Sequence, residues 1–276
     1  AKDEAPKIYP EGNVYGPQYG ALHEKGIKAP TLLEWGDIEQ GFSEADVIVE
    51  DSFTAWPQPH AALEPYAAIA EWRGDELHLW TTTATPYEVQ YGIAYALGIP
   101  QSKVIVHQVH VGGSFGGKYI DRYQAIVALL SKKAGGKRVK IVFTRDEALC
   151  QAKRFLGKMY VKMGARKDGT LTSVYFLAYA DLGGYGNFFG ISAFWGAYPP
   201  MSYKWENARF EGWDVHTNLF TSQPYRSVQL PATVFAIEQT IEELAEKLDM
   251  DPIEFRLKNM PENGDVMPPK PWKANT

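Results

Sequence analysis

The order of hydrophobic and polar positions along this chain predicts strands mixed irregularly with helices. Strands are expected where apolar and polar residues alternate, or where β-branched residues run together. These stretches are residues 46–56, 67–74, 75–85, 103–111, 137–145, 158–169, 170–184 and 208–218. Gly74-Asp75 and the Lys-Asp-Gly sequence at 167–169 are short turn signals, so each predicts a hairpin.

Helices are predicted where the apolar spacing changes to three and four residues. Pro86 opens one helix that ends at Gly98, and further helical patterns cover 119–136 and 146–152. The strongest pattern covers 231–250, and its apolar stripe consists of Val234, Ile237, Ile241, Leu244 and Leu248. Asp251 then fits the N-cap of a further helix, with proline as its first residue. The irregular order predicts an α+β fold with mixed sheets and packed helices.

Three regions are expected along the chain. Residues 1–30 are rich in glycine, proline and charge and predict an extended arm or linker. Residues 31–260 carry the strands and helices and predict one lobe with room for two subdomains, whereas the proline-rich 261–276 predicts an irregular tail. Within the lobe, 183–201 is rich in glycine and aromatic residues without a clear period, which is typical of a functional loop or pocket wall.

Composition narrows the class of protein. The net charge of -5 disfavours a nucleic-acid partner, which would need a basic surface. No apolar run reaches the roughly 20 residues that span a bilayer, and the first residues do not form a signal peptide. Cys150 is the only cysteine, so this chain alone cannot hold a disulfide or an iron–sulfur cluster, and we expect a cytoplasmic protein. The high content of aromatic residues, 13%, fits either a packed core or a pocket for a flat ligand.

The stretch GGSFGGKY at 112–119 is the most distinctive motif. Its spacing matches a phosphate-binding P-loop, but Tyr119 stands where Ser or Thr would bind magnesium, and Phe115 lies within the cradle. A nucleotide-binding module therefore remains a minor alternative. A plain turn would not need so many glycines, because each one costs chain entropy, so we expect the backbone to approach a large ligand.

Together with three other segments, this loop resembles the molybdenum hydroxylases, the xanthine dehydrogenase and aldehyde oxidase family. The segments are PQPHAALEPYAAIA at 57–70, LHLWTTTATPYEVQYGIAYALGIP at 77–100, and YRSVQLPATVFAIEQTIEELAEKLDMDPIEFRLKNM at 225–260. They occur in the family's order and spacing. The chain thus resembles the first molybdopterin-binding lobe of the family's large subunit.

The resemblance implies a set of cofactor-binding positions. Gly113, Phe115 and Gly116 would offer backbone contacts to the molybdenum–pterin cofactor, either in its simple form or in its dinucleotide form. Gln58 would donate a hydrogen bond from its amide, and Arg226 would lie on the second cofactor loop. The pterin sulfurs would hold the metal, so no protein metal ligand is expected. His60 and Glu64 are expected to be structural, and His107 and His110 to point to opposite faces of a strand.

Departures from the family pattern bear on the substrate. Tyr119 stands where purine-oxidising relatives carry an acidic contact, and residues 188–202 contain no arginine. The expected substrate wall is therefore aromatic, and with Tyr119 it consists of Phe188, Phe189, Phe194 and Trp195. Two further departures are Ser227-Val228-Gln229-Leu230 in a loop that is glycine-rich in the family, and Ala84 in place of a glutamine.

The function implied is that of a partial molybdenum-cofactor-binding subunit of an oxidoreductase. Such an enzyme would hydroxylate, or reduce, an aromatic, heteroaromatic or aldehyde substrate. No catalytic residue is assigned here, because the family's catalytic glutamate lies in a region that this chain does not match. The partners implied are a second molybdopterin-binding lobe, which would complete the site, and subunits with iron–sulfur clusters and FAD. A non-catalytic scaffold lobe of the same fold is the main alternative.

Overall fold

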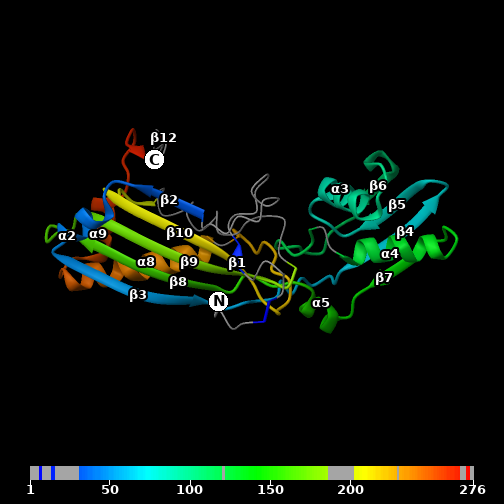
Figure 1. Cartoon of the computed structure of the whole chain (residues 1–276), viewed down its shortest axis with the longest axis horizontal. Helices are drawn as coiled ribbons and strands as arrows, with labels where there is room; N and C mark the ends of the chain where they lie inside the picture. The colour runs from blue at the N-terminus through cyan, green and yellow to red at the C-terminus, as the bar shows by residue number, and fades with distance from the viewer. Residues whose placement is uncertain are drawn as a thin grey trace. The chain divides into compact units, whose positions relative to one another are not determined.

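The computed structural model describes residues 6–7, 14–15, 31–119, 122–185, 202–228, 230–267 and 272–273 (Figure 1). They form two compact units. Unit 1 comprises residues 1–57, 155–222 and 227–276, and unit 2 comprises 58–154 and 223–226. Each unit has its own mixed sheet, helices and core, which confirms the predicted α+β class.

Unit 1 is built on a sheet in the order β1-β10-β9-β8-β3, with β2 also paired to β10. Its strands are β1 (Val14–Tyr15), β2 (Thr31–Trp35), β3 (Val47–Ala55), β8 (Gly157–Ala165), β9 (Leu171–Gly183) and β10 (Asn207–His216). β9 and β10 are parallel and the other pairs are antiparallel. The predicted hairpin at 167–169 is confirmed, because it joins β8 to β9.

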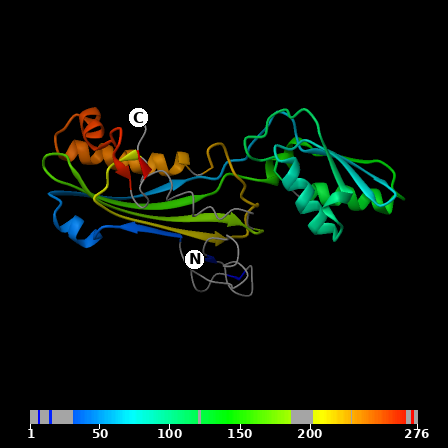
Figure 2. The same cartoon turned by 90° about the horizontal axis from the view of Figure 1, so that it is seen from above.

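Helix α8 (Leu230–Lys247) lies along one face of this sheet and supplies much of the core (Figure 2). Ile237, Ile241 and Leu244 of the predicted stripe are fully buried, whereas Val234 is only partly buried. Ala236 and Ala245 complete the buried face, since small side chains let the helix approach the strands closely. The following helix, α9 (Pro252–Asn259), begins as predicted. The Asp251 carboxylate accepts hydrogen bonds from the first backbone N–H groups of α9.

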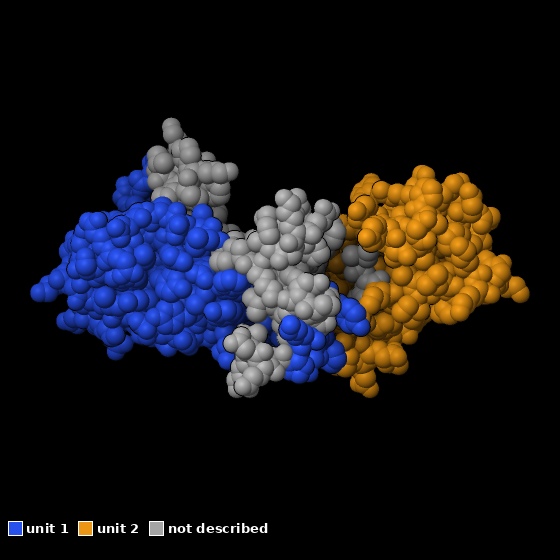
Figure 3. Space-filling model, viewed as in Figure 1, with its two compact units in different colours: residues 1–57, 155–222, 227–276 blue, residues 58–154, 223–226 orange. Residues whose placement is uncertain are grey.

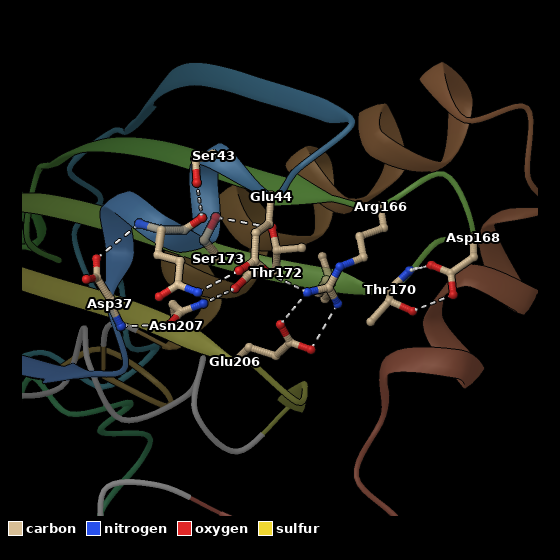
Figure 4. Close-up of polar contacts among 12 residues, drawn as sticks. Asp37, Ser43, Glu44, Arg166, Asp168, Thr170, Thr172, Ser173, Glu206 and Asn207 are labelled. Carbon is tan, nitrogen blue, oxygen red and sulfur yellow. Dashed lines mark hydrogen bonds and ion pairs between the residues drawn. The ribbon is translucent and has the colours of Figure 1, made fainter.

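The sequence pattern did not predict β2 or the short helix α2 (Ile38–Ser43). Asp37 caps α2, and Asn207 accepts a hydrogen bond from the Asp37 N–H at 2.7 Å (Figure 4). Nearby, the Arg166 guanidinium contacts the carboxylates of Glu44 and Glu206 at 2.7 and 3.0 Å. These polar contacts attach α2 to the turn between β8 and β9 and to the start of β10.

Unit 2 is a four-stranded sheet in the order β6-β5-β4-β7, with its helices α3 and α4 packed on one core. Its elements are β4 (Ala67–Arg73), β5 (Glu76–Thr81), α3 (Pro86–Leu97), the 3-10 turn η1 (Gln101–Lys103), β6 (Val104–Gln108), α4 (Arg122–Lys133), β7 (Val139–Val142) and α5 (Arg145–Gln151). β5 and β6 are parallel, and the other pairs are antiparallel. The predicted hairpin at Gly74-Asp75 joins β4 to β5.

Residues 58–154 of unit 2 are inserted in the sequence between β3 and β8 of unit 1. β3 and β8 are register partners up to Ala55 and Gly157. Just beyond them, Pro59 and Lys153 form an isolated bridge, and the Arg154 N–H donates to the Gln58 carbonyl at 2.7 Å. Residues 58–154 therefore begin and end side by side.

Within residues 261–276, β11 (Val266–Met267) pairs with β12 (Trp272–Lys273). The expected boundaries of the arm, the lobe and the tail stay predictions. Among the described helices, none has both the length and the apolar character needed to cross a membrane.

Candidate functional site

The glycine loop at 112–119 lies between β6 and α4 along the chain. It belongs to unit 2, which is drawn in orange in Figure 3. Its backbone takes the left-handed region at Gly113, Phe115 and Gly116, with φ of 97°, 54° and 94°. Phenylalanine rarely adopts a positive φ, and such a conformation costs on the order of 1–3 kcal/mol unless the surroundings hold it in place. The loop is therefore a strained turn that its neighbours must hold in place.

The glycines of this loop allow other segments of the chain to approach closely. A Cβ at Gly116 would lie 2.2 Å from the Pro224 carbonyl oxygen, and one at Gly117 would lie 2.7 Å from the His60 ring. A Cβ at Gly112 would lie 2.6 Å from the Glu64 side chain. We expected the glycines to admit a ligand. In the structure these three admit the chain's own residues.

A buried ion pair fixes the loop to the segment that follows Gln58. The Lys118 side chain is only 1% exposed, and its ammonium group lies 2.5 Å from the Glu64 carboxylate. The same carboxylate accepts a hydrogen bond from the Gly112 N–H at 2.8 Å, and the Gly112 carbonyl accepts one from the Glu64 N–H at 3.2 Å. Glu64 thus holds both ends of the loop.

This arrangement counts against the nucleotide-binding alternative. In a P-loop the lysine reaches phosphate groups. Here the Lys118 ammonium group is paired with the Glu64 carboxylate instead. The cavity enclosed between the loop and residues 60–66 has a volume of about 10 Å³, which is room for a single water molecule. A ligand larger than water would therefore have to contact the loop outside this cavity.

The short segment 223–226 is hydrogen-bonded both to the glycine loop and to the segment that follows Gln58. The Arg226 N–H donates to the Phe115 carbonyl at 3.0 Å, and His60 Nε2 lies 2.7 Å from the Pro224 carbonyl. Nε2 must carry the proton in this contact, because a carbonyl can only accept. Burial lowers the pKa of His60, although the carbonyls of Pro224 and Ala152 oppose that effect. His60 therefore joins two segments through its ring N–H.

Four consecutive backbone N–H groups in the loop have no such role. Within the described part of the chain, the N–H groups of Gly113, Ser114, Phe115 and Gly116 donate no hydrogen bond, whereas those on either side do. Successive N–H groups in a turn with left-handed residues form a concave donor site for anions and polar oxygens. The Phe115 side chain beside them is 49% exposed. The loop therefore has a row of N–H donors that no acceptor in the described part of the chain uses.

The other predicted cofactor residues belong to the same set of segments. The Gln58 side chain is exposed, and its backbone is paired with Arg154. Lys153 accepts a hydrogen bond from the Gln223 N–H at 3.0 Å. The Arg226 side chain is also exposed. Unit 2 thus brings together the segments of all five predicted positions, Gln58, Gly113, Phe115, Gly116 and Arg226.

Of the predicted substrate wall, the described residues include Tyr119. Tyr119 is half-buried at the end of the glycine loop. Phe188, Phe189, Phe194 and Trp195 lie outside the described residues, so their assignment stays a prediction.

Sequence reasoning missed two side chains that shape the site. One is Lys118 with its carboxylate partner, and the other is Arg145, whose guanidinium donates to the Ala62 and Leu63 carbonyls at 2.6 Å each. Each acts across a long sequence separation. The only signal in the sequence is a charged residue placed next to apolar or glycine-rich stretches, which is too common to be specific.

Comparison with known proteins shows the family to which the chain belongs. Residues 22–260 match the molybdopterin cofactor-binding domain, and the chain belongs to that family, within the molybdenum hydroxylases of the xanthine dehydrogenase and aldehyde oxidoreductase type. The resemblance stated from the sequence is thereby confirmed.

Individual relatives show how much of such a protein the chain represents. It is 30% identical over 252 residues to the probable hypoxanthine oxidase XdhD of Escherichia coli K12, covering 90% of this chain and 26% of that protein. It is 31% identical over 243 residues to the nicotinate dehydrogenase large molybdopterin subunit of Eubacterium barkeri, covering 87% and 57%. The aldehyde oxidoreductase structure from Desulfovibrio gigas superposes with a TM-score of 0.85 at 30% identity, covering 97% and 29%. The chain thus spans only part of each relative.

Proposed function

We propose that this chain supplies one side of the binding site for a molybdenum–pterin cofactor in an oxidoreductase. The enzyme acts on an aromatic, heteroaromatic or aldehyde substrate, and its catalytic glutamate lies outside this chain. The observation that carries the proposal is the row of backbone N–H donors from Gly113 to Gly116. These donors lie on the loop that the family resemblance assigns to the cofactor.

The residues present fit such a group. A molybdenum–pterin cofactor carries oxo and phosphate oxygens, which accept hydrogen bonds, and its own sulfurs hold the metal. Backbone N–H groups at 113–116 and the exposed Gln58 amide are suitable donors, and the Arg226 guanidinium suits an anionic oxygen. When bound, the group would supply the two-electron chemistry of the reaction. The chain's residues would bind and orient it.

The loop after Arg226 supports retention of a cofactor site over a scaffold role. Ser227 and Val228 both have positive φ, of 64° and 52°, although neither is glycine. The backbone therefore keeps a conformation that glycine would adopt easily, at a cost of about 1–2 kcal/mol for each residue. Backbone strain of this kind is concentrated at functional sites.

The substrate class rests on the residues beside the loop. Tyr119 replaces a charged contact with a phenol, and the stretch 188–202 contains aromatic residues and no arginine. Such a wall favours flat, apolar substrates over purines, because a purine's polar edge would be left without charged partners. Iron–sulfur and flavin subunits would take the electrons, since this chain has a single cysteine.

The test measures molybdenum and pterin in the purified assembly that contains this chain. Gln58→Ala is expected to lower bound molybdenum per protein, because the exposed amide has a role only toward the cofactor, while the melting temperature stays unchanged. Gln239→Ala, an exposed amide on α8, serves as the matched control. An assembly of wild-type chain and its partners without molybdenum, or an unchanged content in Gln58→Ala, would contradict the assignment.

A further inference from the structure

Helix α3 of unit 2 exposes a row of tyrosines. Tyr87, Tyr91 and Tyr95 are 81%, 53% and 81% exposed, and their four-residue spacing puts them on one face of the helix. The opposite face, with Val89 and Ile93, is buried in the core of the unit. Among its twelve residues, α3 has one charged side chain, Glu88. Helix faces that contact water normally carry several charges.

The neighbouring helix α4 repeats this pattern. Ile126, Leu129 and Leu130 are 49%, 48% and 46% exposed, at the spacing of a single apolar stripe. α3 and α4 contact each other and pack on the same core. Their outer faces together form what we call the helical face, which consists of Tyr87, Tyr91, Tyr95, Ile126, Leu129 and Leu130. Apolar side chains grouped in this way mark protein interaction surfaces.

The charged residues around the helical face indicate the charge expected of its partner. α4 ends in Lys132 and Lys133, both exposed, so the two helices carry more basic than acidic residues in a chain whose net charge is -5. A complementary surface would be apolar at its centre, with carboxylates toward Lys132 and Lys133. A second copy of this chain would instead present the same apolar face with the same lysines.

We propose that the helical face binds the part of the molybdenum subunit that lies outside this chain, a conclusion that rests on the proposed function. In the Escherichia coli relative, the matched region is 26% of the protein, and in the Desulfovibrio gigas structure it is 29%. Most of each relative's polypeptide is therefore available to cover surfaces of this lobe. Tyrosine and leucine side chains at such a contact form the dry centre of an interface, and the lysines form its rim.

The experiment compares the intact assembly, isolated from its host through a tag on this chain, with the chain purified alone. Hydroxyl-radical oxidation is measured at Tyr87, Tyr91 and Tyr95, and a photo-cross-linking amino acid at position 91 identifies the covering peptide. We expect roughly fivefold or greater protection in the assembly, because interface centres exclude water. The cross-linked peptide is expected to come from the molybdenum subunit outside this chain.

A variant with a charge on the face tests the contact directly. Leu129→Glu is expected to return the tyrosines to the oxidation rate of the isolated chain without lowering the melting temperature, because Leu129 lies outside the core. Leu257→Glu on α9, where leucine is 66% exposed, is the matched control and is expected to leave the protection unchanged.

Other results would overturn the proposal. These are equal oxidation in the assembly and the isolated chain, a cross-link to a second copy or to another kind of subunit, and recovery of this chain without any partner. Molybdenum content, measured on the same sample, separates the two proposals. Protected tyrosines without molybdenum would support the docking surface and contradict the proposed function. Bound molybdenum with unprotected tyrosines would support the proposed function and contradict the docking surface.

Discussion

Lys118 shows how a single side chain can determine the shape of the candidate site. Its ammonium group is buried and paired with Glu64, while the same carboxylate binds the Gly112 N–H. The glycine loop is therefore held in place by the Lys118–Glu64 ion pair, and neither charged group needs to touch a ligand. The Arg226 N–H is bonded to the Phe115 carbonyl of the loop, and His60 is bonded to the Pro224 carbonyl in the same segment as Arg226.

Replacing Lys118 by methionine should destabilise unit 2. The Glu64 carboxylate would lose its buried partner, and we expect a loss of about 2–3 kcal/mol in the free energy of unfolding. The cost stays moderate because the Glu64 side chain is one-third exposed to solvent. Urea unfolding measures it. The double variant with Glu64→Gln should recover part of the loss, since glutamine can still accept from Gly112. Equal stability of wild type and Lys118→Met would contradict this account.

A substitution at Ser227 is expected to raise the stability of the protein. Its φ of 64° suits glycine better than serine, and the side chain is exposed. Ser227→Gly should therefore stabilise the protein by about 0.5–1 kcal/mol, whereas Ser227→Ala, which keeps the strained conformation, should not. Thermal unfolding of the two variants provides the comparison. A loss of stability in Ser227→Gly would mean that the serine side chain has a contact worth more than the strain.

His60 predicts a pH dependence with a definite sign. Its pKa in the folded state lies below the ordinary value, chiefly because of burial, so unfolding takes up a proton in mildly acidic solution. The contribution of His60 to the free energy of unfolding should be fully present above about pH 6.5. It should fall as the pH drops toward the lowered pKa, by at most about 1.4 kcal/mol per pH unit. His107, whose pKa is also lowered, contributes in the same direction.

The comparison that isolates His60 is with His60→Gln, whose amide can still donate to the Pro224 carbonyl. Denaturation between pH 5 and 8 should give a flatter curve for the variant than for wild type. Parallel curves would show that His60 does not take up the proton.

At the scale of elements, the glycine loop depends on close packing more than on a flexible backbone. Gly116 and Gly135 both have positive φ, but only Gly116 has a neighbour where its Cβ would be. Gly135→Ala should cost about 1 kcal/mol from strain alone. Gly116→Ala should cost more than about 3 kcal/mol, because the Pro224 carbonyl must move. Chemical denaturation of both variants checks the difference, and equal losses would argue against the close contact.

Most regular elements could be predicted from periodicity, and the reasons for the exceptions are physical. α8 and the strands of the hairpins have clear apolar spacing and strong turn signals. α2 is too short for a period, and its stability depends on Asn207, which is distant in the sequence. The site was predicted by resemblance to a family, residue by residue. Glu64 with Lys118, and the reason for the glycines, could not be predicted, because both arise from contacts between distant segments.

At the scale of the whole molecule, each unit has a separate core. Leu79 is fully buried in the core of unit 2, and Phe176 is fully buried in that of unit 1. Truncation to alanine at either position should cost about 2–5 kcal/mol in the unit concerned. Calorimetry should show that Leu79→Ala lowers one component of the transition and Phe176→Ala the other. If both variants shift a single transition equally, the two cores unfold together.

The adjacent ends of residues 58–154 have a consequence for how this lobe can vary. Ala55 and Gly157 face each other on neighbouring strands, and Pro59 and Lys153 are bridged immediately beyond them. The segment between them is therefore an inserted module in the connection of what would otherwise be an ordinary antiparallel hairpin. Modules with adjoining termini can be exchanged or grafted without disturbing their host sheet. A glycine loop could thus be transplanted between relatives together with the ion pair that shapes it.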